Sequence, residues 1–155
     1  MADDKRHGAP ESTWRTGDAT SAAEALEREH VEVAPLDHDN ARLLDQVHPH
    51  SWVAPTPAPV YNMVVVGAGA GGLVTAAQSA KRGAKVALIE RGMMGGDCLN
   101  IGCVPSKALL ACAKRAAAVR SAGEFGISTS APTVDFGHIM MRMRRIRADI
   151  AAADS

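Results

Sequence analysis

Two cysteines, Cys98 and Cys103, are spaced so that their thiols could react with each other. Four residues separate them, and Gly102 among these lets the chain curl enough to bring the two sulfur atoms into disulfide range. Pro105 places the second thiol at the opening of an expected helix, whose positive end favours thiolate over thiol. The spacing therefore predicts a reactive dithiol.

Two other uses of this cysteine pair stay open. A structural zinc ion needs four ligands at short spacings, and the sequence offers only one nearby pair. The two cysteines could instead be buried apolar side chains, although Gly95 and Gly96 beside them indicate backbone shaped to a site. Cys112 lies nine residues past Cys103 within the expected helix, where we expect packing and no redox role.

A second chemical signal is the turn formed by Gly67, Gly69 and Gly72, which reads G-x-G-x-x-G between an apolar run and a helical segment. The first glycine permits a tight turn, the second lets a pyrophosphate approach the backbone, and the third lets helix pack on strand. Glu90 follows Gly72 by 18 residues, where a carboxylate would accept hydrogen bonds from a ribose hydroxyl. The pattern predicts dinucleotide binding, does not choose between NAD and FAD, and leaves a ligand-free glycine turn as the alternative.

Strands and helices that would position these groups can be placed from hydrophobic pattern. Apolar, β-branched runs predict buried strands over 61–66 and 85–90, and the Ala-rich segment 73–82 between them predicts a helix ended by Gly83. Further on we expect a helix from Pro105 to about Arg120, a short strand over 126–130 and a helix over 135–152. The order strand, glycine turn, helix, strand predicts an α/β fold built on a βαβ unit.

The N-terminal part differs from the rest of the chain in its charge. Residues 1–62 hold five Lys or Arg against eleven Asp or Glu, whereas the remainder holds twelve against six. We expect residues 1–35 to form a largely disordered acidic arm with a marginal helix over 21–30, and residues 36–60 to form a short helix over 39–47 and a proline-rich connector. A boundary near residue 60 would then separate them from a domain at 61–155.

Composition excludes several classes of function. The 155 residues carry no net charge, which gives no electrostatic case for nucleic acid or an anionic membrane as partner. Aromatic residues make up only 3% of the chain, too few for a platform that stacks bases. No run of eighteen apolar residues occurs and the N-terminus is acidic, so we expect a cytoplasmic protein without a signal peptide.

The last helix and the histidines give no sign of a partner or a metal site. Ile139, Met143, Ile146 and Ile150 fall on one face of the 135–152 helix, so we expect an apolar stripe beneath a solvated arginine surface, in preference to a membrane or calmodulin-type partner. The histidines of the N-terminal part lack paired ligand spacing, so we expect no metal site among His7, His30, His38, His48 and His50.

The segment GGDCLNIGCVPSKALL, residues 95–110, resembles the redox-active segment of the class I pyridine nucleotide–disulfide oxidoreductases. The resemblance extends over about residues 36–155, and the stretch VHPHSWVAPTPAPVYNMVVVGAG is most similar to mercuric-reductase-type members. Dihydrolipoamide dehydrogenase and glutathione reductase belong to the same family. Strand, glycine turn, acid and cysteine motif all fall in family order. The joint match is more specific than any one motif.

By this resemblance the bound dinucleotide is FAD, and NAD(P)H is the co-substrate that reduces it. The resemblance implies that Cys98 is the outer thiol that meets substrate and that Cys103 is the inner thiol that lies against the flavin. It also places Lys107 near the reactive end of the isoalloxazine. The substrate it implies is a small disulfide or Hg(II). The implied cofactor-binding residues are Gly67, Gly69, Gly72, Glu90, Gly96 and Lys107.

This sequence departs from the family in one motif position and in extent. Asp97 stands where threonine is commoner, and its charge could weaken FAD binding or require a nearby cation. Family members are considerably longer and form homodimers, so we expect an incomplete Rossmann-like FAD-binding domain, its N-terminal portion only, inactive alone and with uncovered sheet edges. The alternative is a dinucleotide-binding or dithiol-exchange module without NAD(P)H turnover. A non-functional product of a broken gene is the third possibility.

Overall fold

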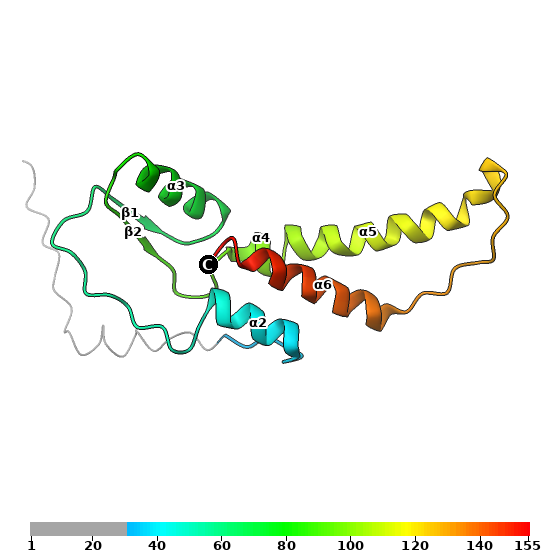
Figure 1. Ribbon diagram of the computed structural model, residues 1–155, viewed down its shortest axis with the longest axis horizontal. Helices are drawn as coiled ribbons and strands as arrows, with labels where there is room; N and C mark the ends of the chain where they lie inside the picture. The colour runs from blue at the N-terminus through cyan, green and yellow to red at the C-terminus, as the bar shows by residue number, and fades with distance from the viewer. Residues whose placement is uncertain (1–30) are drawn as a thin grey trace, which may run out of the picture.

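The computed structural model describes residues 31–155 and has two lobes (Figure 1). One lobe holds a small sheet with a helix packed on it, and the other is a group of helices drawn out to one side. In chain order the elements are α2 (His38–Val47), β1 (Met63–Val66), α3 (Ala70–Lys81), β2 (Val86–Ile89), α4 (Gly96–Asn100), α5 (Cys103–Arg120), the 3-10 turn η1 (Ala122–Phe125) and α6 (Phe136–Ala151). The helix expected over 21–30 and most of the expected disordered arm lie outside the described residues.

The first lobe is the expected βαβ unit. β1 and β2 pair in parallel, with Val64 opposite Ala87 and Val66 opposite Ile89, and α3 connects them and packs on both. A parallel pair needs such a crossover, and the helix ends where Gly83 adopts a φ of +87°, a conformation that glycine reaches without strain. The α/β class and the Rossmann-like order of elements are thus confirmed.

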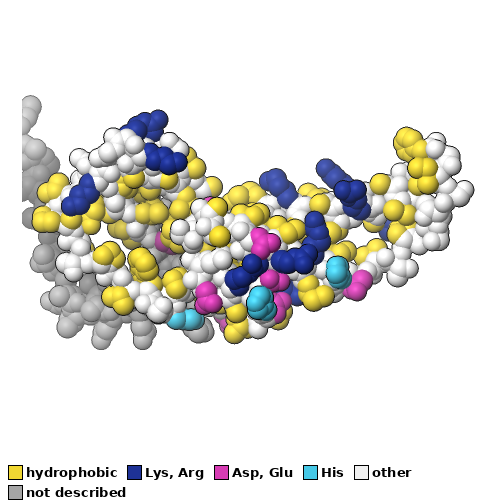
Figure 2. Space-filling model, viewed as in Figure 1, with side chains coloured by type: hydrophobic (Ala, Val, Ile, Leu, Met, Phe, Trp, Pro, Cys, Tyr) yellow, Lys and Arg dark blue, Asp and Glu magenta, His cyan; other side chains and the backbone are white. Residues whose placement is uncertain are grey.

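Both strands are less covered than their apolar sequences would require in a complete sheet. Val66 is 81% exposed and Ile89 is 51% exposed, and hydrophobic side chains show at the surface of this lobe in Figure 2. The described part of the chain holds only these two strands, so no third strand or second helical layer covers their outer faces. This agrees with the expectation of uncovered sheet surface.

The main core lies in the helical lobe. α5 and α6 run side by side in opposite directions, and α2 lies along α6 near the end of the chain (Figure 1). Five residues from three helices form the central cluster: Leu43, Val47, Leu99, Ala148 and Ala151. Asp37 starts α2 by accepting a hydrogen bond from the backbone N–H of Asn40 at 2.9 Å, and Asp135 starts α6 in the same way. The short helix α2 is therefore part of the packed structure.

Two expectations for the last third of the chain were wrong. Residues 126–130 form no strand, because η1 takes up 122–125 and the extended segment that follows has no neighbouring strand to pair with among the described residues. The arginines of α6 do not all lie on a solvated face, since Arg147 is buried together with Met143 and Ala148. Ile150, expected in the apolar stripe, is 41% exposed. The buried face of α6 is rotated toward Arg147 because α2 packs there.

Membrane spans and metal-binding clusters are both absent from residues 31–155. No helix between residues 31 and 155 is both long and apolar enough to cross a membrane. Within the same range, no three side chains of His, Cys, Asp or Glu gather where a metal ion could bind. His48 instead hydrogen-bonds through Nδ1 to the carbonyl oxygen of Gly92 at 2.7 Å, and the ring nitrogen must donate because a carbonyl only accepts.

Candidate dithiol and dinucleotide-binding site

The glycine turn begins where β1 ends. The backbone N–H of Gly67 donates to the carbonyl of Ile89 on β2 at 2.7 Å, and Gly67 itself has a φ of +98°. A Cβ atom added at Gly72 would stand 1.9 Å from the carbonyl oxygen of Gly67, which no real structure tolerates. Glycine at 72 thus lets α3 start directly against the end of β1, as the motif requires.

Glu90 ties this turn to the end of β2. Its Oε2 accepts the backbone N–H of Ala68 at 2.7 Å, and its Oε1 accepts that of Gly92 at 2.8 Å. Burial acts to raise the pKa of Glu90, but the N–H groups of Gly92 and Ala68 outweigh it and the pKa is lowered. The carboxylate is therefore ionised at neutral pH. Each oxygen keeps a lone pair with which a ribose hydroxyl could bond.

The redox segment is attached to the same turn. The backbone N–H of Gly95 donates to the carbonyl of Ala68 at 2.8 Å, and Gly69 and Gly95 form an isolated parallel bridge. Gly96 has a φ of +56°, and a Cβ atom there would lie 2.8 Å from the Cα of Gly69. Two of the predicted cofactor residues, Gly69 and Gly96, are thus in close contact although 26 residues separate them in sequence.

The space around the turn fits the phosphates and sugar of a dinucleotide. No side chain caps the start of α3, so the first N–H groups of that helix are left for a ligand, and a Cβ atom at Gly71 would meet nothing within 4 Å. A hollow of about 370 Å³ opens between the end of β2 and α4. Its lining includes Glu90, Arg91, Gly92, Met93, Gly96 and Asp97. Arg91 supplies a cation in the hollow that Asp97 also faces.

The two cysteines lie on two successive helices. Cys98 is half-buried in α4, and Cys103 is the first residue of α5 and is exposed. Gly102 between the helices approaches α4 so closely that a Cβ atom would lie 2.8 Å from the carbonyl oxygen of Asp97. Both thiols are free, and they lie close enough for Cys103 to raise the pKa of the Cys98 thiol. The two cysteines that the spacing predicts to react therefore lie near each other.

The surroundings of the dithiol act on the pKa of Cys98 in two directions. The hydrogen bond to Cys103, together with burial, raises the pKa of the Cys98 thiol, and the positive charge of Lys107 acts in the opposite direction. Lys107 follows Cys103 by one turn of α5 and is exposed. Cys112 lies farther along α5, with Arg142 Nη1 at 3.8 Å from its sulfur. The structure thus places Lys107, but not Cys112, near the pair.

The sequence did not predict a role for three residues near the dithiol, which are Asn100, Arg147 and Asn40. Asn100, the last residue of α4, donates from Nδ2 to the carbonyls of Gly96 at 2.9 Å and Met94 at 3.1 Å. Its own carbonyl accepts from the buried Arg147 of α6, which also binds Asn40 of α2. An asparagine between two cysteines was the only local signal, because the other two residues come from elsewhere in the chain.

The chain matches one protein family and several curated proteins. A family model described as pyridine nucleotide-disulphide oxidoreductase matches residues 61–153. Over 82 residues the chain is 48% identical to a dihydrolipoyl dehydrogenase from Chlamydia muridarum (strain MoPn / Nigg). The matched stretch covers 53% of this chain and 18% of that protein. The chain is 43% identical over 77 residues to a mercuric reductase from Streptomyces lividans, which covers 49% of this chain and 16% of that protein.

The chain therefore spans about a fifth of the length of the curated relatives it matches. The family model nevertheless covers more than half of the chain and includes the glycine turn, Glu90 and both cysteines of the pair. This protein belongs to the pyridine nucleotide-disulphide oxidoreductase family.

Proposed function

We propose that this chain carries the flavin-binding turn and the dithiol of an FAD-dependent oxidoreductase, which passes electrons from NAD(P)H to the Cys98–Cys103 disulfide and on to a small disulfide or Hg(II). The observation that carries the proposal is the direct attachment of the redox segment to the glycine turn through Gly95 and Ala68. A dithiol and a dinucleotide turn held this close suit electron transfer between a cofactor and two thiols. The homodimer found in full-length family members stays a prediction for this chain.

The residues around the turn have separate roles in holding FAD. The uncapped start of α3 at Gly69 would receive the pyrophosphate, while Gly72 keeps that helix against β1. Glu90 would accept a ribose hydroxyl on a lone pair left by its two backbone bonds. Lys107 would place positive charge near the flavin and the inner thiol. When bound, FAD supplies the exchange of two electrons between a nicotinamide hydride and the thiols.

The dithiol can carry out the second half of the reaction by itself. The pKa of the Cys98 thiol is raised by its hydrogen bond to Cys103, so Cys98 attacks only after it has lost its proton. Attack of a thiolate on a substrate disulfide forms a mixed disulfide and releases one substrate thiol. Attack by the other cysteine then releases the second thiol and closes the Cys98–Cys103 bond, so two electrons and two protons pass to the substrate. With Hg(II), the two thiolates would bind the ion.

The exposure of the two thiols bears on which cysteine meets the flavin and which meets the substrate. Cys103 is exposed and Cys98 is half-buried, whereas the proposed roles put Cys103 against the flavin. A flavin seated on this face would cover Cys103 and leave Cys98 as the thiol that meets substrate. The same exposure favours dithiol exchange with a partner, without flavin turnover, as the second candidate function.

A titration with FAD followed by alkylation separates these functions. Tight binding, read from quenching of flavin fluorescence, is expected to slow iodoacetamide modification of Cys103 more than that of Cys98. Gly72→Val should abolish both effects, because its side chain cannot fit beside Gly67. Exchange with glutathione disulfide in the absence of any FAD binding would favour the exchange module. Neither binding nor exchange would refute both functions.

A further inference from the structure

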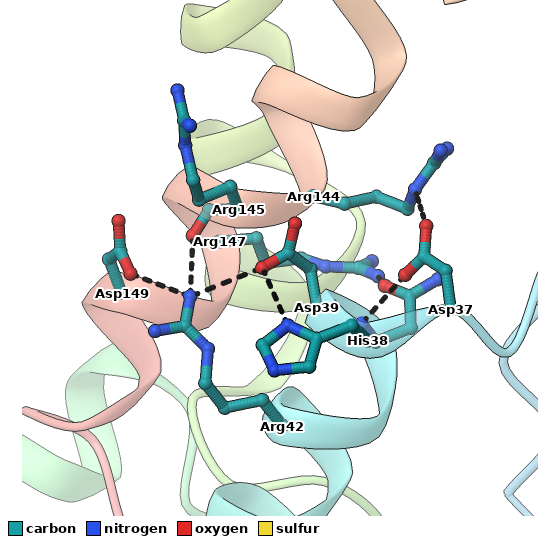
Figure 3. Close-up of polar contacts among 9 residues, drawn as sticks. Asp37, His38, Asp39, Arg42, Arg144, Arg145, Arg147 and Asp149 are labelled. Atoms are coloured by element: carbon teal, nitrogen blue, oxygen red, sulfur yellow. Dashed lines mark hydrogen bonds and ion pairs between the residues drawn. The ribbon is translucent and has the colours of Figure 1, made fainter.

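Arg147 is a buried cation that joins three helices. It lies on α6 and is 9% exposed. Its Nη1 donates to the carbonyl oxygen of Asn100 at 2.7 Å, and its Nη2 donates to Oδ1 of Asn40 on α2. Figure 3 shows the Arg147 side chain running from α6 toward α2, behind the ion pairs of Arg42.

The contact with Asn100 falls between the two cysteines. Asn100 is two residues past Cys98 and three before Cys103, and it ends α4. A helix of five residues has little stability of its own, and its last carbonyls have no partner within the helix. Arg147 satisfies one of these carbonyls, while the Asn100 side chain holds the start of α4 through Gly96. The chain between the two thiols is thus fixed from both ends of α4.

Stability alone does not explain this arrangement. Burial lowers the pKa of Arg147, which reflects the cost of removing a charge from water, although arginine stays protonated. Its Nε and the Oδ1 of Asn100 are buried without a hydrogen-bond partner among the described residues. Nearby, Arg144 binds Asp37 and Arg42 binds Asp149, and these more exposed pairs already join α2 to α6. What Arg147 adds is a hydrogen bond to the end of α4.

We propose that Arg147, oriented by Asn40, is a positioning residue that keeps the Cys98 and Cys103 thiols in contact by anchoring the end of α4. The inference rests on the proposed redox role of this pair. Release of Asn100 would let α4 move against α5, and closing the disulfide would then cost more conformational entropy. The disulfide should become easier to reduce when Arg147 is lost.

The test measures the equilibrium of the dithiol with glutathione in the full chain, with Cys112→Ser in every variant so that only the pair reacts. One glutathione disulfide oxidises the dithiol and yields two glutathione thiols, and trapping with iodoacetamide followed by mass spectrometry gives the oxidised fraction. Arg147→Met is expected to lower the oxidation constant about tenfold, the scale of one hydrogen bond to a charged group. That change equals about 30 mV. Asn40→Ala should lower the constant less, about threefold, because the bond to Asn100 remains.

The matched control is Arg144→Met, which breaks a contact between the same two helices without touching α4. It should leave the constant within about twofold of the parent protein. The pH dependence of Cys98 alkylation gives a second readout, because loss of contact with Cys103 should bring the raised pKa of Cys98 back toward its ordinary value. If Arg147→Met does not fold, the oxidation constant of Asn40→Ala tests the proposal in its place.

The outcomes are distinct from those of the proposed function. A shifted constant in the Arg147 or Asn40 variant, with Arg144→Met unchanged, supports the positioning role. An equal shift in Arg144→Met, or an unchanged constant in both test variants, overturns it. If the parent protein forms no Cys98–Cys103 disulfide in any glutathione buffer, the proposed redox role of the pair itself fails.

Discussion

Replacement of Gly72 by alanine should disrupt the joint between β1 and α3. The new Cβ would stand 1.9 Å from the carbonyl oxygen of Gly67, against a minimum of 3.0 Å for real Cβ atoms. The start of α3 and the end of β1 must therefore move apart by at least 1.1 Å. The contacting atom is backbone, and the N–H of the same residue is bonded to β2, so no flexible side chain can give way.

Overpacking of this kind costs about 1–3 kcal/mol. Gly71→Ala is the matched control, because a Cβ atom there meets nothing within 4 Å and alanine is a better helix former than glycine by about 1 kcal/mol. Urea unfolding followed by circular dichroism would measure both variants, and amide hydrogen exchange on β1 and β2 would locate the loss. Because both positions lie in α3, alanine's better helix propensity is common to the two variants, and Gly72→Ala should be the less stable by about 1–3 kcal/mol. Equal stability of the two alanine variants would refute the steric argument.

Three further predictions follow from the site and its core. Glu90→Gln should lower stability at pH 7 by about 1 kcal/mol, since one backbone N–H loses its acceptor at a partly exposed position. Folding lowers the pKa of Glu90 from its ordinary value of 4.5. Its contribution to the free energy of unfolding is therefore present above that value and is lost as the pH falls through the lowered pKa. Urea unfolding of the parent protein and of Glu90→Gln should accordingly show a smaller difference in stability at pH 3 than at pH 7. Leu99→Ala should cost about 2–5 kcal/mol by the same assay, because Leu99 is almost fully buried in the core beside the dithiol. Arg42→Met should cost less than about 1 kcal/mol despite its 2.6 Å ion pair with Asp149, since the Asp149 side chain is 55% exposed and water screens the pair. A double-mutant cycle with Asp149→Asn would measure the pair.

What the sequence predicted well was local. The β-branched run before Gly67, the glycine at 83 and the Asp135 cap each mark an element boundary through the conformation of a few neighbouring residues. The strands and the helices α3, α5 and α6 therefore appear close to where they were expected. The glycine motif could also be read locally, because the shape of a tight turn depends on which residues lack a side chain.

What the sequence did not predict depends on distant contacts. No helix was expected over 96–100, yet α4 folds as a helix because Leu99 packs into the core and Asn100 bonds back to Gly96. Residues 126–130 include the β-branched Ile127 and Thr129 but have no strand beside them among the described residues. Arg147 follows the polar pattern of α6, and only the approach of Asn40, which precedes it by 107 residues, turns that position inward.

The segment before residue 61 acts on the redox site although the family model starts after it. The carbonyl of Val47 accepts the N–H of Met94 at 2.9 Å, and His48 binds the carbonyl of Gly92. These bonds hold residues 92–94 immediately before the glycines that contact the dinucleotide turn, while Asn40 holds the far end of α4 through Arg147. α2 thus fixes both sides of the Cys98 helix. Changes in α2 should accordingly alter the dithiol equilibrium while leaving the βαβ unit intact, because α2 packs on α6 and not on the sheet.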